Sequence, residues 1–442
     1  MGVSLETIGR YQILEQVGAG SNGMVYRCFD PVLKREVAVK VPAADLSGDE
    51  LQTVVDNFYH EAEIGAQFQH ANIVTVYDVG GDLTQSDRRS DIDQSHYLVM
   101  ELADGMSLKD YLQQDGRLPV EEALKVIFQC CKALDYIHFQ GVLHRDIKPS
   151  NIIYDADSMS VKITDFSISA YADRPSEKQP GTLPFSAPEH FLADKMLTRQ
   201  TDIFALGSVM YQMLTGSCPF QGESVDEVAS RIVSSNPKPI REYRDDIPAQ
   251  VEFIVLKAMS KLQRARFQDA VEFTDAVSLA LNTIGVGRNG YADKHRKSTE
   301  IDEYLILRNN SWFSEFSPDQ IDELVRSGSV LSYEADEYIV KEGDPASSFY
   351  TLLDGQAEVV KRGRMINILK PGACFGELGH LTKTHRRTAS IRATTTVRVL
   401  VVETEKLRDL SAESQAEFYR AFLTITMERL LEKNDQFIEA EA

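Results

Sequence analysis

Four polar side chains at short, fixed spacing stand out near the middle of the sequence. Asp146, Lys148 and Asn151 fall within one short segment, and Asp165 follows after an apolar stretch. Phosphoryl transfer requires mainly positioning and charge: a carboxylate for the attacking hydroxyl, oxygen ligands for magnesium and cations beside the phosphates. The segment supplies all three kinds of group, so it predicts a site for phosphoryl transfer.

Upstream residues have the types needed to hold a nucleotide. Lys40 falls on an expected strand, and Glu61 falls in a helix expected over residues 51–68 from its apolar spacing. We expect Glu61 to pair with Lys40 and to hold it beside the α- and β-phosphates. Before them, between two strands expected from β-branched runs over 11–17 and 25–29, glycines would let the backbone approach phosphates closely. These glycines are Gly18, Gly20 and Gly23.

Further motifs follow in a fixed order. Ala187-Pro188-Glu189 closes the segment that begins at Asp165. Asp202 begins a long apolar run that predicts a buried helix, and Arg266 is placed to form an ion pair with Glu189. From residue 8 to residue 282, this order of motifs resembles the eukaryotic-type serine/threonine protein kinase family.

The resemblance implies a fold, bound groups and roles for residues. The fold is α+β with two lobes, an N-lobe at about 8–101 and a C-lobe at about 104–282, with ATP and Mg²⁺ between them. Asp146 would accept the proton of the substrate hydroxyl, while Asn151 and Asp165 would bind magnesium. Residues implied to bind ATP are Gly18, Gly20, Gly23, Val25, Ala38, Lys40, Met100, Glu101, Ala103 and Ile153. A lysine two residues after Asp146, here Lys148, is typical of serine and threonine kinases, so the expected substrates are serine and threonine hydroxyls of proteins.

Two positions depart from the family pattern. Ser167 replaces the usual glycine two residues after Asp165, and Gly65 stands one turn after Glu61, where the family generally packs an apolar side chain. Both belong to parts that move between inactive and active states, so they bear on basal activity more than on chemistry. The alternative is a pseudokinase that acts as a signalling scaffold, which the retained phosphate and metal ligands disfavour.

Several hydroxyls are candidates for regulatory phosphorylation. Arg145 precedes Asp146, and the resemblance implies that it binds a phosphate on the activation segment, where we choose Ser176. Ser298 and Thr299 directly follow a basic cluster at 294–297. That segment is either a solvated linker extended by its charges or an autoinhibitory segment that leaves the substrate cleft when a ligand binds.

The composition changes after the kinase-like part. Residues 283–306 contain glycines and a basic cluster but little apolar periodicity, which predicts a linker. Residues 307–435 contain short apolar runs separated by glycine turns at roughly 8–12-residue spacing, followed by a helical pattern over 416–436. This pattern predicts a small antiparallel β-barrel of jelly-roll type with flanking helices.

A second ligand site is expected in this barrel. The turn at 375–379 can present backbone N–H groups to an anion, and Arg387 can grip the same phosphate. With the glycine turns before them, these residues resemble the cyclic-nucleotide-binding domain family. By that resemblance Arg387 would bind the cyclic phosphate, Glu377 the ribose 2′-hydroxyl, and Thr388 could contact a guanine, while cAMP and cGMP both stay open. Backbone donors would come from Gly376, Leu378 and Gly379.

The rival interpretation is a domain that keeps this fold for interaction only, with Glu377 and Arg387 in a salt bridge. The sensor half of a transcription factor is disfavoured, because the residues that follow the barrel are few and acidic. The formal charge of -20 likewise disfavours nucleic acid or an anionic membrane as the main partner.

The remaining composition points to a globular cytoplasmic protein. The chain of 442 residues is 43% hydrophobic, which suits two or three domains with sizeable cores. Five scattered cysteines without a Cys-x-x-Cys pair indicate reduced thiols rather than disulfides or a zinc site. The longest apolar run is too short to span a bilayer. Protein substrates and a small-molecule cyclic nucleotide are therefore the expected partners.

Overall fold

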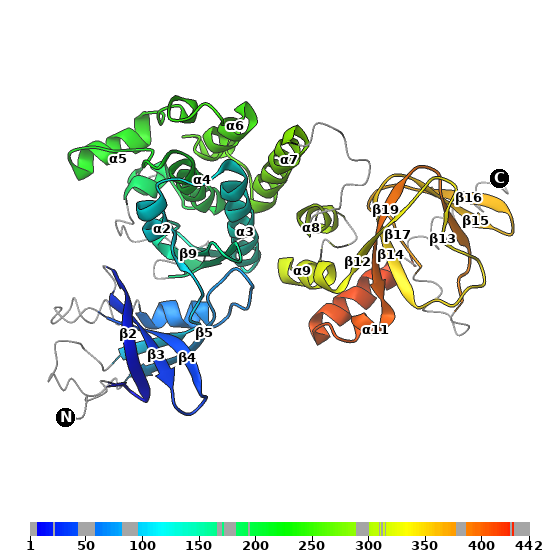
Figure 1. Ribbon diagram of the computed structural model, residues 1–442, viewed down its shortest axis with the longest axis horizontal. Helices are drawn as coiled ribbons and strands as arrows, with labels where there is room; N and C mark the ends of the chain where they lie inside the picture. The colour runs from blue at the N-terminus through cyan, green and yellow to red at the C-terminus, as the bar shows by residue number, and fades with distance from the viewer. Residues whose placement is uncertain are drawn as a thin grey trace. The chain divides into compact units, whose positions relative to one another are not determined.

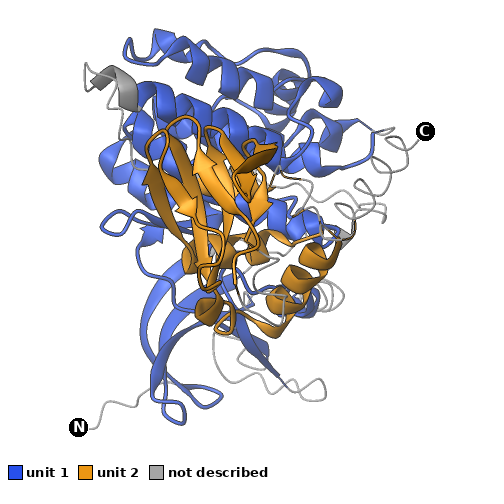
Figure 2. Cartoon of the chain, turned by 90° about the vertical axis from the view of Figure 1, so that its right-hand side faces the viewer, with its two compact units in different colours: residues 1–290 blue, residues 291–442 orange. Residues whose placement is uncertain are grey.

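The computed structural model describes residues 7–20, 23–42, 58–81, 96–165, 170–171, 183–192, 195–288, 300–308, 310, 313, 315–376, 386–424 and 427. The chain divides into two compact units, residues 1–290 and residues 291–442 (Figure 2). Each unit has its own sheets and its own buried core.

Unit 1 begins with a six-stranded antiparallel sheet (Figure 1). In the spatial order β1-β2-β3-β4-β6-β5, its strands are β1 (Thr7–Ile8), β2 (Tyr11–Gly20), β3 (Gly23–Asp30), β4 (Arg35–Val41), β6 (His96–Met100) and β5 (Val76–Gly81). Residues 58–65 are helical, and Phe58 and Ala62 pack against Ala38, Leu98 and Met100 of the sheet. The strands expected at the N-terminus are confirmed. The helix expected over 51–68 ends at residue 65, and its first residues lie outside the described ranges.

The rest of unit 1 is mainly helical. Its helices are α2 (Leu108–Asp115), α3 (Val120–Phe139), α4 (Arg199–Thr215), α5 (Val225–Ser234), α6 (Ala249–Ala258) and α7 (Ala270–Arg288). Short strands are β7 (Met106–Ser107), β8 (Val142–Leu143), β9 (Ile152–Asp155), β10 (Ser160–Ile163) and β11 (Ala170–Tyr171). Short 3-10 helices are η1 (Pro149–Asn151), η2 (Leu183–Phe185), η3 (Pro188–Phe191), η4 (Ile240–Glu242) and η5 (Gln263–Ala265).

Helix α4 is the apolar run that begins at Asp202 in the sequence, and it is buried along most of its length, as expected. A capping box between Thr198 and Thr201 begins the helix, and Gly216 ends it in the left-handed region at φ 76. Within the described ranges, no helix has both the length and the apolar composition needed to cross a bilayer.

Two four-stranded antiparallel sheets form the body of unit 2 (Figure 1). One has the order β12 (Ser329–Tyr333), β19 (Val397–Glu403), β14 (Ser348–Asp354) and β17 (Cys374–Phe375). The other has the order β13 (Tyr338–Val340), β18 (Ser390–Ala393), β15 (Ala357–Lys361) and β16 (Arg364–Leu369). The expected barrel is therefore confirmed.

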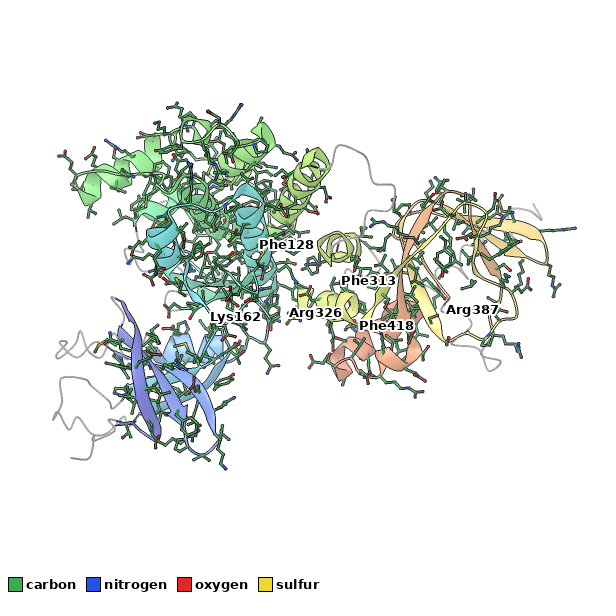
Figure 3. The ribbon with its side chains drawn as sticks, viewed as in Figure 1. Phe128, Lys162, Phe313, Arg326, Arg387 and Phe418 are labelled. Atoms are coloured by element: carbon green, nitrogen blue, oxygen red, sulfur yellow. The ribbon has the colours of Figure 1, made fainter. Side chains whose placement is uncertain are left out.

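Helices cover one side of this barrel. They are α8 (Glu300–Arg308), α9 (Pro318–Ser327), α11 (Thr404–Leu407) and a helix at residues 412–424. Phe313 and Phe418, marked in Figure 3, belong to the apolar cluster that these helices share with Phe349 of β14. Side chains that alternate along the strands, such as Leu352 and Val399, form a second cluster inside the barrel.

Helices extend into the expected linker, 283–306, from both ends. Helix α7 continues to Arg288, and α8 already begins at Glu300. The reason for the early start of α8 is packing: Tyr304 and Leu307 are buried in the cluster of unit 2, a tertiary contact that a composition window does not reveal.

Candidate active site and ligand site

A buried lysine joins two carboxylates from distant parts of unit 1. Nζ of Lys40, on β4, donates to both carboxylate oxygens of Glu61, at 2.9 and 3.0 Å. The same nitrogen donates to Oδ1 of Asp165 at 2.6 Å. Lys40 and Glu61 are 3% and 4% exposed. The expected Lys40–Glu61 pair is thus present, with Asp165 beside it.

Burial and charge oppose each other at these three groups. Burial raises the pKa of Glu61 to about 7, against the charge of Lys40. Burial would also raise the pKa of Asp165, but the charge and hydrogen bond of Lys40 lower it below its ordinary value. Burial lowers the pKa of Lys40, and the two carboxylates more than compensate and raise it. When both carboxylates are ionised, one lysine between them leaves excess negative charge, which suits a bound cation.

Asp146 is oriented by two neighbours in its own loop. Nζ of Lys148 lies 2.6 Å from Oδ2 of Asp146, and Nδ2 of Asn151 donates to the same oxygen at 3.0 Å. Nδ2 of Asn151 also donates to the backbone carbonyl of Asp146 at 3.0 Å. Oδ1 of Asp146 accepts no hydrogen bond from any residue in the described ranges. That oxygen is therefore available to a substrate hydroxyl.

The oxygen donors of this site suit magnesium. Because the amide nitrogen of Asn151 is bound to Asp146, its amide oxygen faces away from Asp146, and Asp165 adds a carboxylate. Magnesium prefers oxygen ligands and is commonly bound by one or two protein groups plus substrate phosphates. No cluster of three or more His, Cys, Asp or Glu side chains that could hold a metal occurs in the described part of the chain, so the phosphates would supply further ligands.

Asp202 holds the backbone that leads into Asp146. Its Oδ1 accepts from the backbone N–H of Arg145 at 2.7 Å, and its Oδ2 accepts from that of His144 at 2.9 Å. Nε2 of His138 lies 2.8 Å from Oδ2. Burial would raise the pKa of Asp202, but the hydrogen bond and charge of His138 lower it below its ordinary value. The sequence placed Asp202 only at the start of a helix.

Some of the residues implied to bind ATP come together. Val25, Ala38, Met100 and Ala103 belong to one apolar cluster, whereas Ile153 of β9 is half-buried outside it.

The glycine-rich strands are paired as the expected turn requires. Gly18 pairs with Val25 and Gly20 with Gly23. A Cβ atom on Gly23, which has φ 139, would lie 2.0 Å from the carbonyl oxygen of Val41, so only glycine fits there.

The carboxylate of Glu101 has a role that spacing did not suggest. Nζ of Lys162, marked in Figure 3, lies 2.9 and 3.0 Å from its two oxygens, and the N–H of Thr75 donates to Oε2 at 3.2 Å. These contacts tie the segment after β6 to β10 and to the start of β5. The expected ion pair between Arg266 and Glu189 is also present, at 2.7 Å.

In unit 2, Arg387 is buried and bound on several sides. Its Nη1 donates to the carbonyl oxygens of Ser348 and Gly376, at 2.7 and 3.1 Å, and its Nη2 donates to Oγ of Ser348 at 3.1 Å. A Cβ atom on Gly376, which has φ 96, would lie 2.7 Å from Nη1 of Arg387. Gly376 and Arg387 thus lie in contact, and their binding of a cyclic phosphate stays a prediction. Figure 3 marks Arg387 among the strands of the barrel.

An aromatic stack supports the guanidinium of Arg387. The ring centroid of Tyr350 lies 5.3 Å from Cζ of Arg387, and the ring of Phe375 stacks on Tyr350 at 5.1 Å. The hydroxyl of Tyr350 lies 3.0 Å from Oγ of Ser348. The sequence did not indicate Ser348 or Tyr350 as site residues. Ser348 contributes a backbone carbonyl, which every residue has, and Tyr350 is an aromatic residue of a kind that is common in barrel strands.

Thr388 is half-buried beside Arg387. Several candidate residues lie outside the described residues: Ser167, Ser176, Ser298, Thr299, Glu377, Leu378 and Gly379.

Comparisons with known proteins find one family match in each unit. Residues 11–275 match the family model of the protein kinase domain, and residues 330–414 match that of the cyclic nucleotide-binding domain. The serine/threonine-protein kinase PrkC of Bacillus subtilis is 33% identical over 278 residues, which are 62% of this chain and 41% of that protein.

PknB of Mycobacterium leprae is 36% identical over 268 residues, which are 60% of this chain and 42% of that protein. PknB of Mycobacterium tuberculosis is 36% identical over 269 residues, which are 60% of this chain and 41% of that protein. The aligned part of this chain therefore spans about two fifths of the length of these curated relatives.

Proposed function

We propose that this chain, which belongs to the protein kinase family, transfers the γ-phosphoryl group of ATP to serine and threonine hydroxyls of proteins. The contact of Lys40 with both Glu61 and Asp165 carries this proposal. It brings a phosphate-binding cation next to a metal-binding carboxylate, which is the combination that phosphoryl transfer requires.

Asp146 orients the attacking hydroxyl. Lys148 and Asn151 hold Oδ2 of Asp146, so Oδ1 can accept a hydrogen bond from the hydroxyl and then its proton. Lys148 places a positive charge beside the reacting groups. Asp202 keeps this loop in place through the backbone of His144 and Arg145.

Lys40 would bind the α- and β-phosphates, and Glu61 would keep it directed at them. Asn151 and Asp165 would hold Mg²⁺, which when bound neutralises charge on the phosphates. The excess negative charge at Lys40, Glu61 and Asp165 supports this assignment, because a cation would compensate it.

Turnover by purified full-length chain tests the proposal. Asp146→Ala and Asp165→Ala should each abolish measurable phosphate incorporation, since each removes several kcal/mol of transition-state stabilisation. Asp157→Ala, at an exposed turn of the same lobe, is the matched control. Undiminished turnover in either active-site variant would disprove the assigned roles.

We further propose that a cyclic nucleotide bound in unit 2 regulates this activity. Arg387 supports the proposal, since it is buried with its Nη groups at the glycine turn where a cyclic phosphate would lie. The rival function is a pseudokinase scaffold with a ligand-blind interaction domain. Calorimetry with cAMP and with cGMP, and ATP turnover with and without each, separates the two. A chain that binds neither nucleotide and turns over no ATP is the scaffold.

A phosphate on the activation segment is a second regulatory input that we propose, with Ser176 as its position. The side chain of Arg145 is 7% exposed, and its Nε has no hydrogen-bond partner among the described residues. A phosphate would satisfy this buried guanidinium. Phosphopeptide mapping of active chain that finds no phosphate between Asp165 and Glu189 refutes the proposal.

The basic segment before Ser298 and Thr299 is our proposed autoinhibitory element. The cyclic nucleotide must then bind the released state more tightly than the inhibited state. A tenfold activation requires about 1.4 kcal/mol of coupling between nucleotide binding and release of the segment. Deleting residues 294–299 should raise basal turnover toward the nucleotide-stimulated level. In the intact chain, Ser298 or Thr299 should be autophosphorylated. If the deletion changes neither the basal turnover nor the response to nucleotide, the segment is only a linker.

A further inference from the structure

Strand β16 does not alternate buried and exposed side chains as a barrel strand does. Five of its six residues are exposed, and only Leu369 is buried. Three exposed residues are large and apolar: Met365 is 59% exposed, Ile366 is 52% and Ile368 is 49%. Large apolar side chains gathered on one strand commonly mark an interaction site.

A bulge in the ladder accounts for part of this exposure. Val359 of β15 pairs with Asn367, and Val360 pairs with Met365, so Ile366 has no partner across the ladder. A bulge breaks the alternation of side chains and bends the strand. Because of it, Met365 and Ile366 are exposed although they are consecutive residues.

The outer edge of β16 is also open in the described part of the chain. The strand is last in its sheet, and β15 is the one described strand that pairs with it (Figure 1). The N–H of Ile368 donates to Oδ1 of Asn367 at 2.8 Å, a local bond that a docked strand could replace. An open edge strand offers backbone donors and acceptors to another extended segment.

Cations lie at both ends of this strand. Lys361, Arg362 and Arg364 are exposed at its start, and Lys370 is exposed just after its end. None of the four forms an ion pair with another described residue. On a chain of net charge -20, this local concentration of positive charge is unusual.

The charges decide between candidate occupants. If two copies paired through β16 in antiparallel fashion, the Arg364 end of one strand would meet the Lys370 end of the other, which is unfavourable. An extended segment with acidic ends and apolar residues between them complements both the charges and the apolar side chains.

We propose that β16 binds such a segment of another protein as an added strand, with its acidic ends beside Arg364 and Lys370 and its apolar side chains on Met365, Ile366 and Ile368. Main-chain hydrogen bonds would supply affinity, and the apolar and charged contacts would supply specificity. The proposal does not depend on either nucleotide site.

A library of random eight-residue peptides displayed on phage, selected on the intact chain, tests this. Enriched sequences should have acidic residues at both ends and β-branched or aromatic residues between them. A synthetic peptide of the enriched sequence should bind the variant with Met365→Thr, Ile366→Thr and Ile368→Thr roughly tenfold more weakly or worse. Arg364→Glu with Lys370→Glu should also weaken binding and remove its dependence on salt.

Leu331→Thr, at an exposed position of β12, is the matched control and should leave binding unchanged. Equal enrichment on the triple variant would overturn the proposal. So would a dimer in light scattering that the triple variant dissociates, because the occupant would then be a second copy. Binding to phosphatidylserine vesicles that the triple variant loses, without peptide enrichment, would overturn it in favour of a membrane.

Discussion

A Cβ atom on Gly65 would lie 2.7 Å from Cγ2 of Val76. Gly65 is the last residue of the helix at 58–65, which also carries Glu61, and Val76 begins β5. Val76 therefore occupies the space where the kinase family generally packs a side chain from the helix. A side chain at position 65 would therefore have to displace Val76 or move this helix, and with it Glu61, relative to the sheet.

Gly65→Leu should lower both stability and turnover. The added side chain must displace Val76, and overpacking of this kind costs about 1–3 kcal/mol. Urea unfolding and steady-state turnover of the same preparation measure the two effects. Val76→Ala in the Gly65→Leu background should restore part of each, whereas Val76→Ala alone should not raise activity. A Gly65→Leu chain more active than the native one would contradict this account of the contact.

Asp202 should contribute stability that depends on pH. Its folded pKa is lowered below the unfolded value of about 4, so its contribution is present above that value and is lost as pH falls through the folded pKa. Asp202→Asn should reduce the free energy of unfolding at pH 7 by about 2–4 kcal/mol, since His138 and two backbone N–H groups lose a charged partner.

The difference between the native chain and Asp202→Asn should shrink as the pH falls below about 4. Urea unfolding at a series of pH values measures it, and Asp157→Asn, at an exposed position, is the control. A difference that stays constant from pH 7 to pH 3 would show that the carboxylate charge is not what stabilises the loop.

Arg387→Ala should weaken cyclic nucleotide binding by about a hundredfold or more, because a buried phosphate would lose a paired, charge-assisted contact. Arg387→Lys should restore only part of the affinity, since an ammonium group cannot make the paired contact. Calorimetry on the three chains provides the measurement. Equal affinity in all three would place the phosphate elsewhere.

Tyr350→Leu should weaken the same binding about three- to tenfold, because the guanidinium of Arg387 would lose the ring beneath it. Tyr350→Phe keeps the ring and loses only the contact with Ser348, so its effect should be smaller. Tyr338→Leu, at an exposed tyrosine of β13, is the control. If Leu and Phe at position 350 behave alike, the hydroxyl and not the ring supports Arg387.

The order and spacing of residue types were enough to predict the kinase-like part, the barrel and the contacts among Asp146, Lys148 and Asn151. Asp146, Lys148 and Asn151 contact one another within a few residues, so their spacing already implies their geometry. The buried helix α4 was also predictable, because a long apolar run is stable only where it is removed from water.

The contacts between residues far apart in the sequence could be known only from the tertiary structure. Asp165 reaches Lys40 across 125 residues, and Lys162 of β10 binds the carboxylate of Glu101, which follows β6 of another sheet. Arg387 donates to the backbone carbonyl of Ser348. Every residue has a backbone carbonyl, so the residue type at position 348 could not predict this contact. The early start of α8 and the exposure of β16 have the same origin, since burial and strand register arise from packing between segments that the sequence leaves far apart.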